Sequence, residues 1–173
     1  MSKVPLRRLR LRAGEEHREQ VDVALEPFVL GGGRYEPTQG VVPAELVVQR
    51  ASSGDVFRLR FSTRIEGPCM RCLGVAAVEL DVDAQEYESS DTTADPELRS
   101  EYVHDGELDA DAWAHDQVAL ALPEPILCRP DCAGLCPVCG KNLNDEPHEH
   151  DEVVTDPRWA ALEALRSDDS ADR

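Results

Sequence analysis

Six cysteines are the residues of this chain whose type and spacing could do chemistry: Cys69, Cys72, Cys128, Cys132, Cys136 and Cys139. The last four are spaced C-x3-C-x3-C-x2-C, and the first two form a separate C-x2-C upstream. A C-x2-C followed by Gly can aim both sulfurs at one tetrahedral centre, because Gly accepts the required dihedral and backbone N–H groups donate to the thiolates. Cys136–Gly140 has this pattern, and Cys69–Gly74 is a looser version with its Gly one place later. These knuckles predict bound zinc.

Two histidines, His148 and His150, extend the set of candidate ligands to eight. A structural zinc takes four ligands, so the sequence allows one or two ions. The favoured arrangement joins the two knuckles as in a zinc ribbon, with Cys69, Cys72, Cys136 and Cys139. Its second site would then hold Cys128, Cys132, His148 and His150. The other arrangement keeps a single centre within 128–139 and leaves the upstream pair free. Spacing alone does not decide between them, and the histidines could equally belong to a solvated acidic tail.

Basic residues next to the cysteines would offset the negative charge of thiolates: Arg71, Arg129 and Lys141. A redox dithiol at Cys136–Cys139 is less favoured, because it would follow a βαβ pattern and use a lone cysteine pair. Buried free thiols are a further alternative. A hydrolytic metal enzyme would need a base over an open zinc, and the helical motif H-E-x-x-H is absent. We therefore expect no catalytic residues and no enzyme.

The chain of 173 residues has a net charge of −17, which argues against a protein that coats duplex nucleic acid. Basic residues without any acid mark an N-terminal arm, residues 1–14: Lys3, Arg7, Arg8, Arg10 and Arg12. Such an arm indicates a local anionic contact or self-neutralisation against the acidic body. Neither a membrane-length apolar run nor a secretory signal is present, which predicts a cytoplasmic protein without a membrane partner. Metal then explains the cysteines better than disulfides do.

Alternating apolar residues predict strands at 21–25, 41–49, 57–65 and 78–84. The last two strands form a hairpin with the Cys69–Cys72 knuckle at its tip. Arg58, Arg60 and Arg64 share one face of this hairpin. They could contact a phosphate backbone, although pairing with acids of the neighbouring strand is the favoured interpretation.

Residues 89–109 read as an acidic, mobile connection that could contain a short strand near Tyr102-Val103. Asp109 is expected to cap a helix over Ala110–Leu122, with Trp113 as a core anchor. A second helix is expected from Asp156, with Trp159, Leu162 and Leu165 toward the body. The predicted fold is α+β: one domain over 15–166, with an antiparallel sheet, a zinc-knuckle hairpin, two C-terminal helices and a zinc-ribbon-like segment at 128–150. Residues 167–173 are expected to form a disordered tail.

These motifs, in this order, resemble the YceD-like family. The resemblance runs from about Phe57 to Leu165 and is most specific in Cys128…Asp131-Cys132-Ala133-Gly134-Leu135-Cys136-Pro137-Val138-Cys139-Gly140-Lys141-Asn142-Leu143-Asn144, followed by Asp156-Pro157-Arg158-Trp159. It implies a bacterial cytoplasmic factor that supports synthesis, processing or stability of large-subunit ribosomal RNA. Many members have C-x-C where this chain has His148-Glu149-His150, and imidazole can replace thiolate at zinc.

The expected function is therefore a non-enzymatic zinc-binding factor of ribosome biogenesis without a small-molecule substrate. Its expected partner is large-subunit ribosomal RNA, a pre-ribosomal particle or an assembly protein. Candidate RNA contacts are the basic arm and the hairpin arginines: Lys3, Arg7, Arg8, Arg10, Arg12, Arg58, Arg60 and Arg64. The alternative is a zinc-stabilised protein-interaction adaptor that makes no direct RNA contact.

Overall fold

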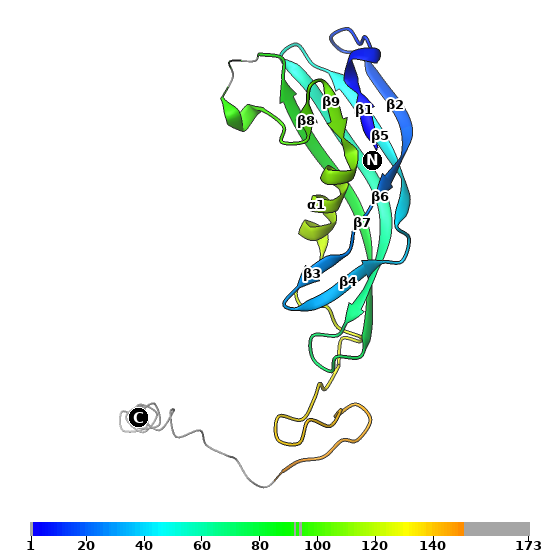
Figure 1. The fold of residues 1–173 in the computed structure, drawn as a ribbon, viewed down its shortest axis with the longest axis vertical. Helices are drawn as coiled ribbons and strands as arrows, with labels where there is room; N and C mark the ends of the chain where they lie inside the picture. Colours follow the sequence, from blue (N-terminus) through cyan, green and yellow to red (C-terminus); the bar gives the residue numbers. More distant parts are fainter. Residues whose placement is uncertain (1, 92, 94, 151–173) are drawn as a thin grey trace, which may run out of the picture. The chain divides into compact units, whose positions relative to one another are not determined.

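The computed structural model describes residues 2–91, 93 and 95–150 (Figure 1). The chain divides into two compact units, Met1–Cys132 and Ala133–Arg173. The helix expected from Asp156 and the tail expected at 167–173 lie outside the described residues. The single domain expected over 15–166 reaches into the same residues and stays a prediction.

A six-stranded antiparallel sheet forms most of the first unit (Figure 1). Its strands are β2 (Glu16–Ala24), β3 (Phe28–Leu30), β4 (Gly33–Pro37), β5 (Val41–Arg50), β6 (Gly54–Pro68) and β7 (Val75–Ser89). One edge of β6 pairs with β5 and, further along, with β4, while its other edge pairs with β7 over its whole length. The hairpin β6–β7 therefore spans the sheet and carries residues 69–74 at its tip.

Alternation along β6 sets the core face of this sheet. Phe57, Leu59, Phe61 and Ile65 are buried, as the sequence predicts, because every second side chain of a strand points to the same face. Gly67 is required where β6 passes Tyr35, since a Cβ at this position would lie 2.1 Å from a ring carbon of Tyr35.

A smaller antiparallel sheet has the order β1 (Lys3–Pro5), β9 (Glu107–Asp109) and β8 (Val103–His104). The 3-10 helices η1 (Leu6–Arg8) and η2 (Pro96–Leu98) flank its strands in the sequence. The short strand expected near Tyr102-Val103 is confirmed by β8. The expectation of a loop as far as Asp109 is wrong, because β8 and β9 form a hairpin inside that stretch that pairs with the N-terminal arm.

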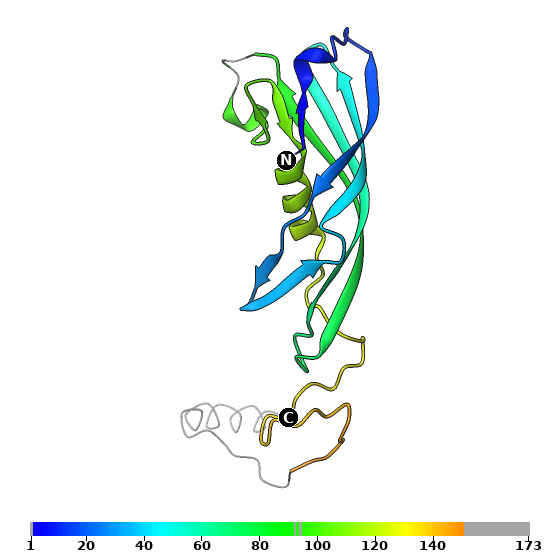
Figure 2. The same ribbon diagram turned by 45° about the vertical axis from the view of Figure 1, so that its right-hand side comes forward.

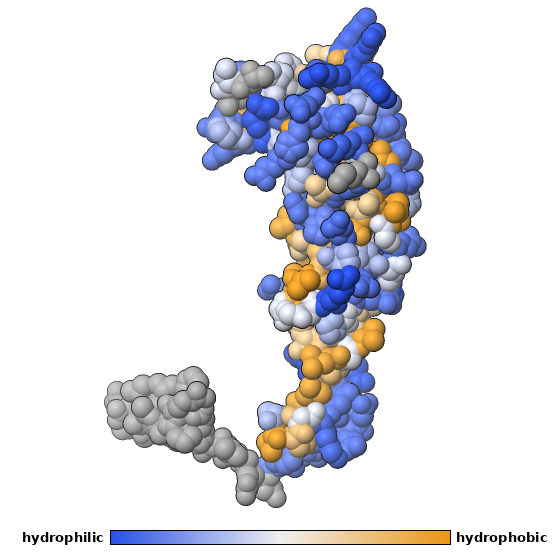
Figure 3. All heavy atoms as spheres, in the orientation of Figure 1, coloured by the Kyte–Doolittle hydropathy of each residue, from blue (hydrophilic) through white to orange (hydrophobic). Residues whose placement is uncertain are grey.

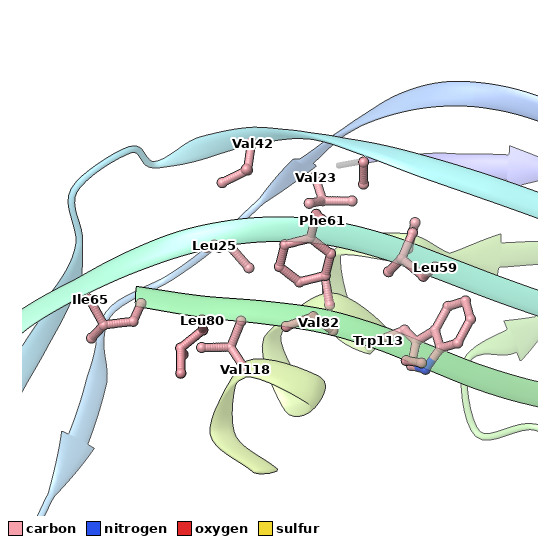
Figure 4. Packing of buried hydrophobic residues seen from close by; sticks show 14 of the residues in the cluster. Val23, Leu25, Val42, Leu59, Phe61, Ile65, Leu80, Val82, Trp113 and Val118 are labelled. Carbon is pink, nitrogen blue, oxygen red and sulfur yellow. The ribbon is translucent and has the colours of Figure 1, made fainter. Parts of the chain in front are cut away.

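One α-helix is found in the described part of the chain, α1 (Ala110–Ala121). The Asp109 side chain accepts a hydrogen bond from Ala112 N at 3.1 Å, as expected of an N-cap. The helix lies on one side of the large sheet (Figure 2) and places Trp113 and Val118 in the core, which confirms the predicted helix and its anchor (Figure 4). The described residues thus form mostly antiparallel β structure with one α-helix, and the second expected helix lies outside them. No helix among the described residues has the length and apolar character needed to cross a bilayer.

Candidate metal centres

Four cysteines of the first unit converge at the tip of the β6–β7 hairpin: Cys69, Cys72, Cys128 and Cys132. Their sulfur atoms all lie within 4.8 Å of one another. The Sγ–Sγ distances are 3.8 Å for Cys69 and Cys132 and 3.6 Å for Cys72 and Cys128. A tetrahedral zinc with Zn–S bonds of about 2.3 Å would place its sulfurs about 3.8 Å apart, whereas a disulfide would bring them to about 2.05 Å. The cysteines are free thiols in a spacing that fits one tetrahedral ion.

Backbone and side-chain hydrogen bonds bring the segment after α1 to this hairpin tip. Met70 N donates to Ile126 O at 3.0 Å, and Ile126 is buried. Arg71 Nη1 donates to Cys132 O at 2.9 Å. These contacts, together with the prolines that end α1, hold residues 123–132 at the hairpin tip, so that Cys128 and Cys132 meet the upstream pair.

The turn of the first knuckle is made by Leu73, which has a φ of +61°. Cys69 N donates to Gly74 O at 2.6 Å and Leu73 N donates to Cys69 O at 3.0 Å, which closes the turn. The sequence suggests that the neighbouring glycine takes the left-handed dihedral, but φ is positive at Leu73 and not at Gly74. A left-handed conformation costs a non-glycine residue roughly 1–2 kcal/mol, so the knuckle is held by its surroundings and not by local preference.

The hydrogen bonds around Cys69 favour its thiolate form. Burial raises the pKa of Cys69, but backbone N–H groups, first that of Cys72 and then those of Cys128 and Arg71, lower it to about 6. Burial raises the pKa of Cys128 to about 12, with further contributions from the neighbouring thiols. Four thiols this close cannot all ionise without a cation among them, which is the electrostatic environment that a divalent metal ion stabilises.

The second unit holds another group of four residues: Cys136, Cys139, His148 and His150. Here the knuckle turns as expected at Gly140, which has a φ of +73°. Cys136 N donates to Lys141 O at 2.8 Å and Gly140 N donates to Cys136 O at 2.9 Å. The loop that leads to the histidines is fixed by Asn144, whose Oδ1 accepts from Ala133 N at 2.8 Å.

His148 is oriented for ligation through its ε nitrogen. Its Nδ1 lies 2.7 Å from Glu146 O, so that this nitrogen donates to the carbonyl, and its Nε2 faces Cys139 Sγ at 3.1 Å. The Glu146 carbonyl and the Cys136 thiol raise the pKa of His148, and the Cys139 N–H lowers the pKa of Cys136 to about 6. A backbone carbonyl on one ring nitrogen commonly fixes the tautomer of a metal-binding histidine.

The family model of the large ribosomal RNA subunit accumulation protein YceD matches residues 57–166. The chain belongs to the YceD family. This match includes all eight residues of the two clusters, and the description of the family names no enzymatic activity.

Relatives of this YceD chain include uncharacterized mycobacterial proteins. Those of Mycobacterium tuberculosis and Mycobacterium bovis are 36% identical over 123 residues, which cover 68% of this chain and 58% of theirs. An uncharacterized protein of Mycobacterium leprae is 35% identical over 107 residues, 58% of this chain and 48% of its own length. The chain thus spans about half the length of these relatives. No solved structure matches it.

In this YceD chain the eight candidate ligands fall into two groups of four, which differ from both arrangements drawn from the spacing. The run C-x3-C-x3-C-x2-C divides in its middle, between Cys132 and Cys136. The physical reason is the path of residues 123–132, which returns to the hairpin tip and separates the first two cysteines of the run from the last two. Met70 and Ile126, which fix this path, carry no motif that could have identified them in the sequence.

The basic residues near the clusters have varied partners. Lys141 Nζ pairs with Glu146 Oε2 at 2.6 Å, and Arg129 Nε lies 3.5 Å from Asp131 Oδ1. Arg71 donates to the Cys132 carbonyl and so contacts a ligand segment directly. Of the candidate RNA contacts, Arg58, Arg60 and Arg64 form ion pairs on the outer face of the sheet.

Proposed function

We propose that this chain is a non-enzymatic zinc-binding factor that supports the accumulation of large-subunit ribosomal RNA, with its metal acting as a structural clamp. The observation that carries the metal assignment is the four-sulfur cluster with Sγ–Sγ distances of 3.6 and 3.8 Å. Tetrahedral thiolate sites select zinc or an iron–sulfur cluster, and the Cys2His2 donor set of the second group fits zinc as well. The ribosomal RNA role is supported by the family description.

A clamp agrees better with the first site than a catalytic centre does. A hydrolytic zinc keeps one coordination position open for water, whereas this site offers four protein sulfurs to one ion. Cys69 and Cys132 are buried, which further limits access to the ion. An ion held there would cross-link the hairpin tip to the segment that follows α1, and its effect would be on folding.

Deletion of the gene tests the RNA role. We expect lower amounts of mature large-subunit ribosomal RNA relative to small-subunit RNA, restored by the wild-type chain but not by the variant C69S/C132S. Unchanged precursor and mature RNA levels in the deletion strain would refute the role. Native mass spectrometry before and after chelation tests the metal. Two zinc ions per chain are expected, and a folded chain that binds none would refute the clamp.

A zinc-stabilised adaptor that contacts only proteins is the second candidate, favoured by the net charge of −17. The two functions differ in their response to nuclease. Ribosome-assembly proteins that remain bound to the tagged chain after nuclease treatment would support the adaptor. Partners lost with the RNA would support direct contact.

A further inference from the structure

We propose that the N-terminal basic arm, and not the arginine face of the β6–β7 hairpin, is the surface that binds the phosphate backbone of RNA. The arm residues are Lys3, Arg7, Arg8, Arg10 and Arg12. The proposal rests on the proposed role in ribosomal RNA accumulation and assigns its direct contact to one of two candidate surfaces.

The hairpin arginines are already neutralised by acids of neighbouring strands. Arg58 binds Asp83 through two hydrogen bonds, Nε to Oδ1 and Nη2 to Oδ2, both of 2.6 Å. Arg60 lies 3.3 Å from Asp83 and 3.5 Å from Glu45. Bidentate guanidinium–carboxylate pairs are among the strongest side-chain contacts, and a phosphate would have to displace them.

Arg64 likewise forms two ion pairs, with Glu66 at 3.0 Å and with Glu79 at 2.7 Å. The side-chain hydrogen bond from Arg58 lowers the pKa of Asp83 to about 2, so this carboxylate stays charged at neutral pH. The face therefore presents an approaching phosphate with four carboxylates beside its three arginines.

The basic residues of the arm, in contrast, are not neutralised by acids in the described part of the chain. All five of these side chains are exposed. Within the part of the chain that the structure describes, none of the five has an ion pair, although the arginines of the large sheet have them. Hydrophilic residues predominate at the end of this unit where the chain runs from β1 to β2 (Figure 1 and Figure 3). Unpaired cations on an acidic protein form a localised positive surface, as recognition of a phosphate backbone requires.

The arm is also held in place, which lowers the entropy lost on binding. Its strand β1 pairs with β9 at Val4 and Leu108. Leu6 N donates to Gly106 O at 3.0 Å, and Gly14 N donates to Arg50 O at 2.8 Å, which fixes both ends of the segment between them.

Three leucines that alternate with the arginines pack against the core: Leu6, Leu9 and Leu11. Because they face inward, the arm does not present the apolar surface that an interfacial membrane segment inserts among lipid headgroups. A basic segment could bind either a nucleic acid or an anionic lipid surface. This arrangement favours the nucleic acid, because it has no apolar layer into which side chains must insert.

Two triple variants with the same change of net charge test the proposal on the full-length chain. R8Q/R10Q/R12Q removes three arm charges, and R58Q/R60Q/R64Q removes three hairpin charges. Arg7 is left in place because it packs against Gly106, where a Cβ would lie 2.8 Å from its Nε. The probe is a fluorescein-labelled single-stranded RNA of mixed sequence, titrated between 50 and 200 mM salt, and circular dichroism confirms that both variants fold.

Each phosphate contact to a single strand contributes about 0.7 to the slope of log K against log salt. Loss of three contacts should lower the slope by about 2, so that the ratio of wild-type to arm-variant affinity shrinks roughly 20-fold between 50 and 200 mM salt. The hairpin variant should keep the wild-type slope. An equal or larger loss in the hairpin variant would overturn the proposal, and so would an unchanged arm variant.

The outcome can be separated from that of the proposed function. If the wild-type chain binds no RNA but the deletion strain still lacks large-subunit RNA, the arm proposal fails and the role in RNA accumulation stands. If the chain binds phosphatidylglycerol vesicles and no RNA, the arm belongs to a membrane surface and the proposal is overturned. Unaltered RNA levels in the deletion strain would refute the proposed function whatever the arm binds.

Discussion

Removal of the four-sulfur site should destabilise the first unit strongly, whereas removal of the second site should leave that unit unchanged. The Cys72–Cys128 and Cys69–Cys132 pairs join residues 56 and 63 apart in the sequence, whereas Cys139 and His148 are only 9 apart. The chain-entropy relation for a cross-link gives about 4 kcal/mol for the long loops and roughly 2.6 kcal/mol for the short one. The first site thus restrains the unfolded chain over a much longer loop.

Urea unfolding followed by the fluorescence of Trp113 measures this effect. Trp113 is completely buried in the first unit, and W159F as the parent chain removes the other tryptophan. With a denaturant slope of about 2 kcal/mol per molar urea, a loss of about 4 kcal/mol lowers the midpoint by roughly 2 M. We expect that shift in C69S/C132S with zinc present, and in the parent chain after chelation.

The variant C136S/C139S is the matched control, because it removes two ligands from the other site. Its Trp113 midpoint should equal that of the parent chain and still fall on chelation. The midpoint of C69S/C132S should be insensitive to zinc. If C69S/C132S unfolded at the parent midpoint, or if both double variants lowered it equally, the assignment of a long-range clamp to the first unit would be refuted.

Three further predictions concern ligand grouping, the strained turn and the neutralised hairpin face. Cys72 and Cys128 belong to the same group of ligands, whereas Cys72 and Cys139 belong to different groups. Native mass spectrometry should therefore find one zinc ion in C72S/C128S and none in C72S/C139S. The reverse result would support the ribbon arrangement that the spacing favours. Leu73→Gly should raise the free energy of unfolding by up to about 1 kcal/mol in urea titrations, because φ is +61° there, and a decrease would contradict the strain. Carboxyl NMR titration should give Asp83 a pKa of about 2 in the folded protein. The ion pair of Asp83 therefore stabilises the fold fully above the unfolded-state pKa of about 4, and this stabilisation is lost as the pH falls through 2. In R58Q the Asp83 value should return toward the ordinary range, and an unaltered value would contradict the pairing.

Strands and helices whose signals lie within a short stretch of sequence could be predicted, including the buried face of a strand and the N-cap of a helix. The buried face of β6 follows from strict alternation between Phe57 and Ile65, and Asp109 caps α1 because its carboxylate reaches an N–H three residues ahead. The pairing of the hairpin arginines follows from the acids at alternate positions of β7. In each case the decisive partner lies nearby in the sequence or directly across one turn.

The grouping of the ligands depends on long-range contacts that spacing does not encode. Cys128 lies closer in sequence to Cys136 than to Cys72, yet its sulfur lies 3.6 Å from that of Cys72. The hydrogen bond from Met70 N to Ile126 O contributes to this path, and neither residue type indicates such a role. The sequence does not indicate strand β9 for a similar reason, since its acidic residues are typical of a loop and its pairing partner lies in the N-terminal arm.

The position of the first cluster shows what a bound metal ion would add to the fold. Near the middle of the sheet, α1 packs against β2 and β7 and buries Trp113 and Val118, and hydrophobic contacts hold the layers together. At the hairpin tip the apolar side chains of Met70, Leu73 and Val75 are 58%, 67% and 79% exposed, so little apolar area is buried to retain the segment after α1. Apart from the candidate ligand Cys132, Ile126 is the one buried apolar residue of residues 123–132. An ion bound by four sulfurs would hold the chain segments together at this end of the sheet, as packing against the helix does further along. We therefore expect chelation to lower the free energy of unfolding of the unit that contains the cluster.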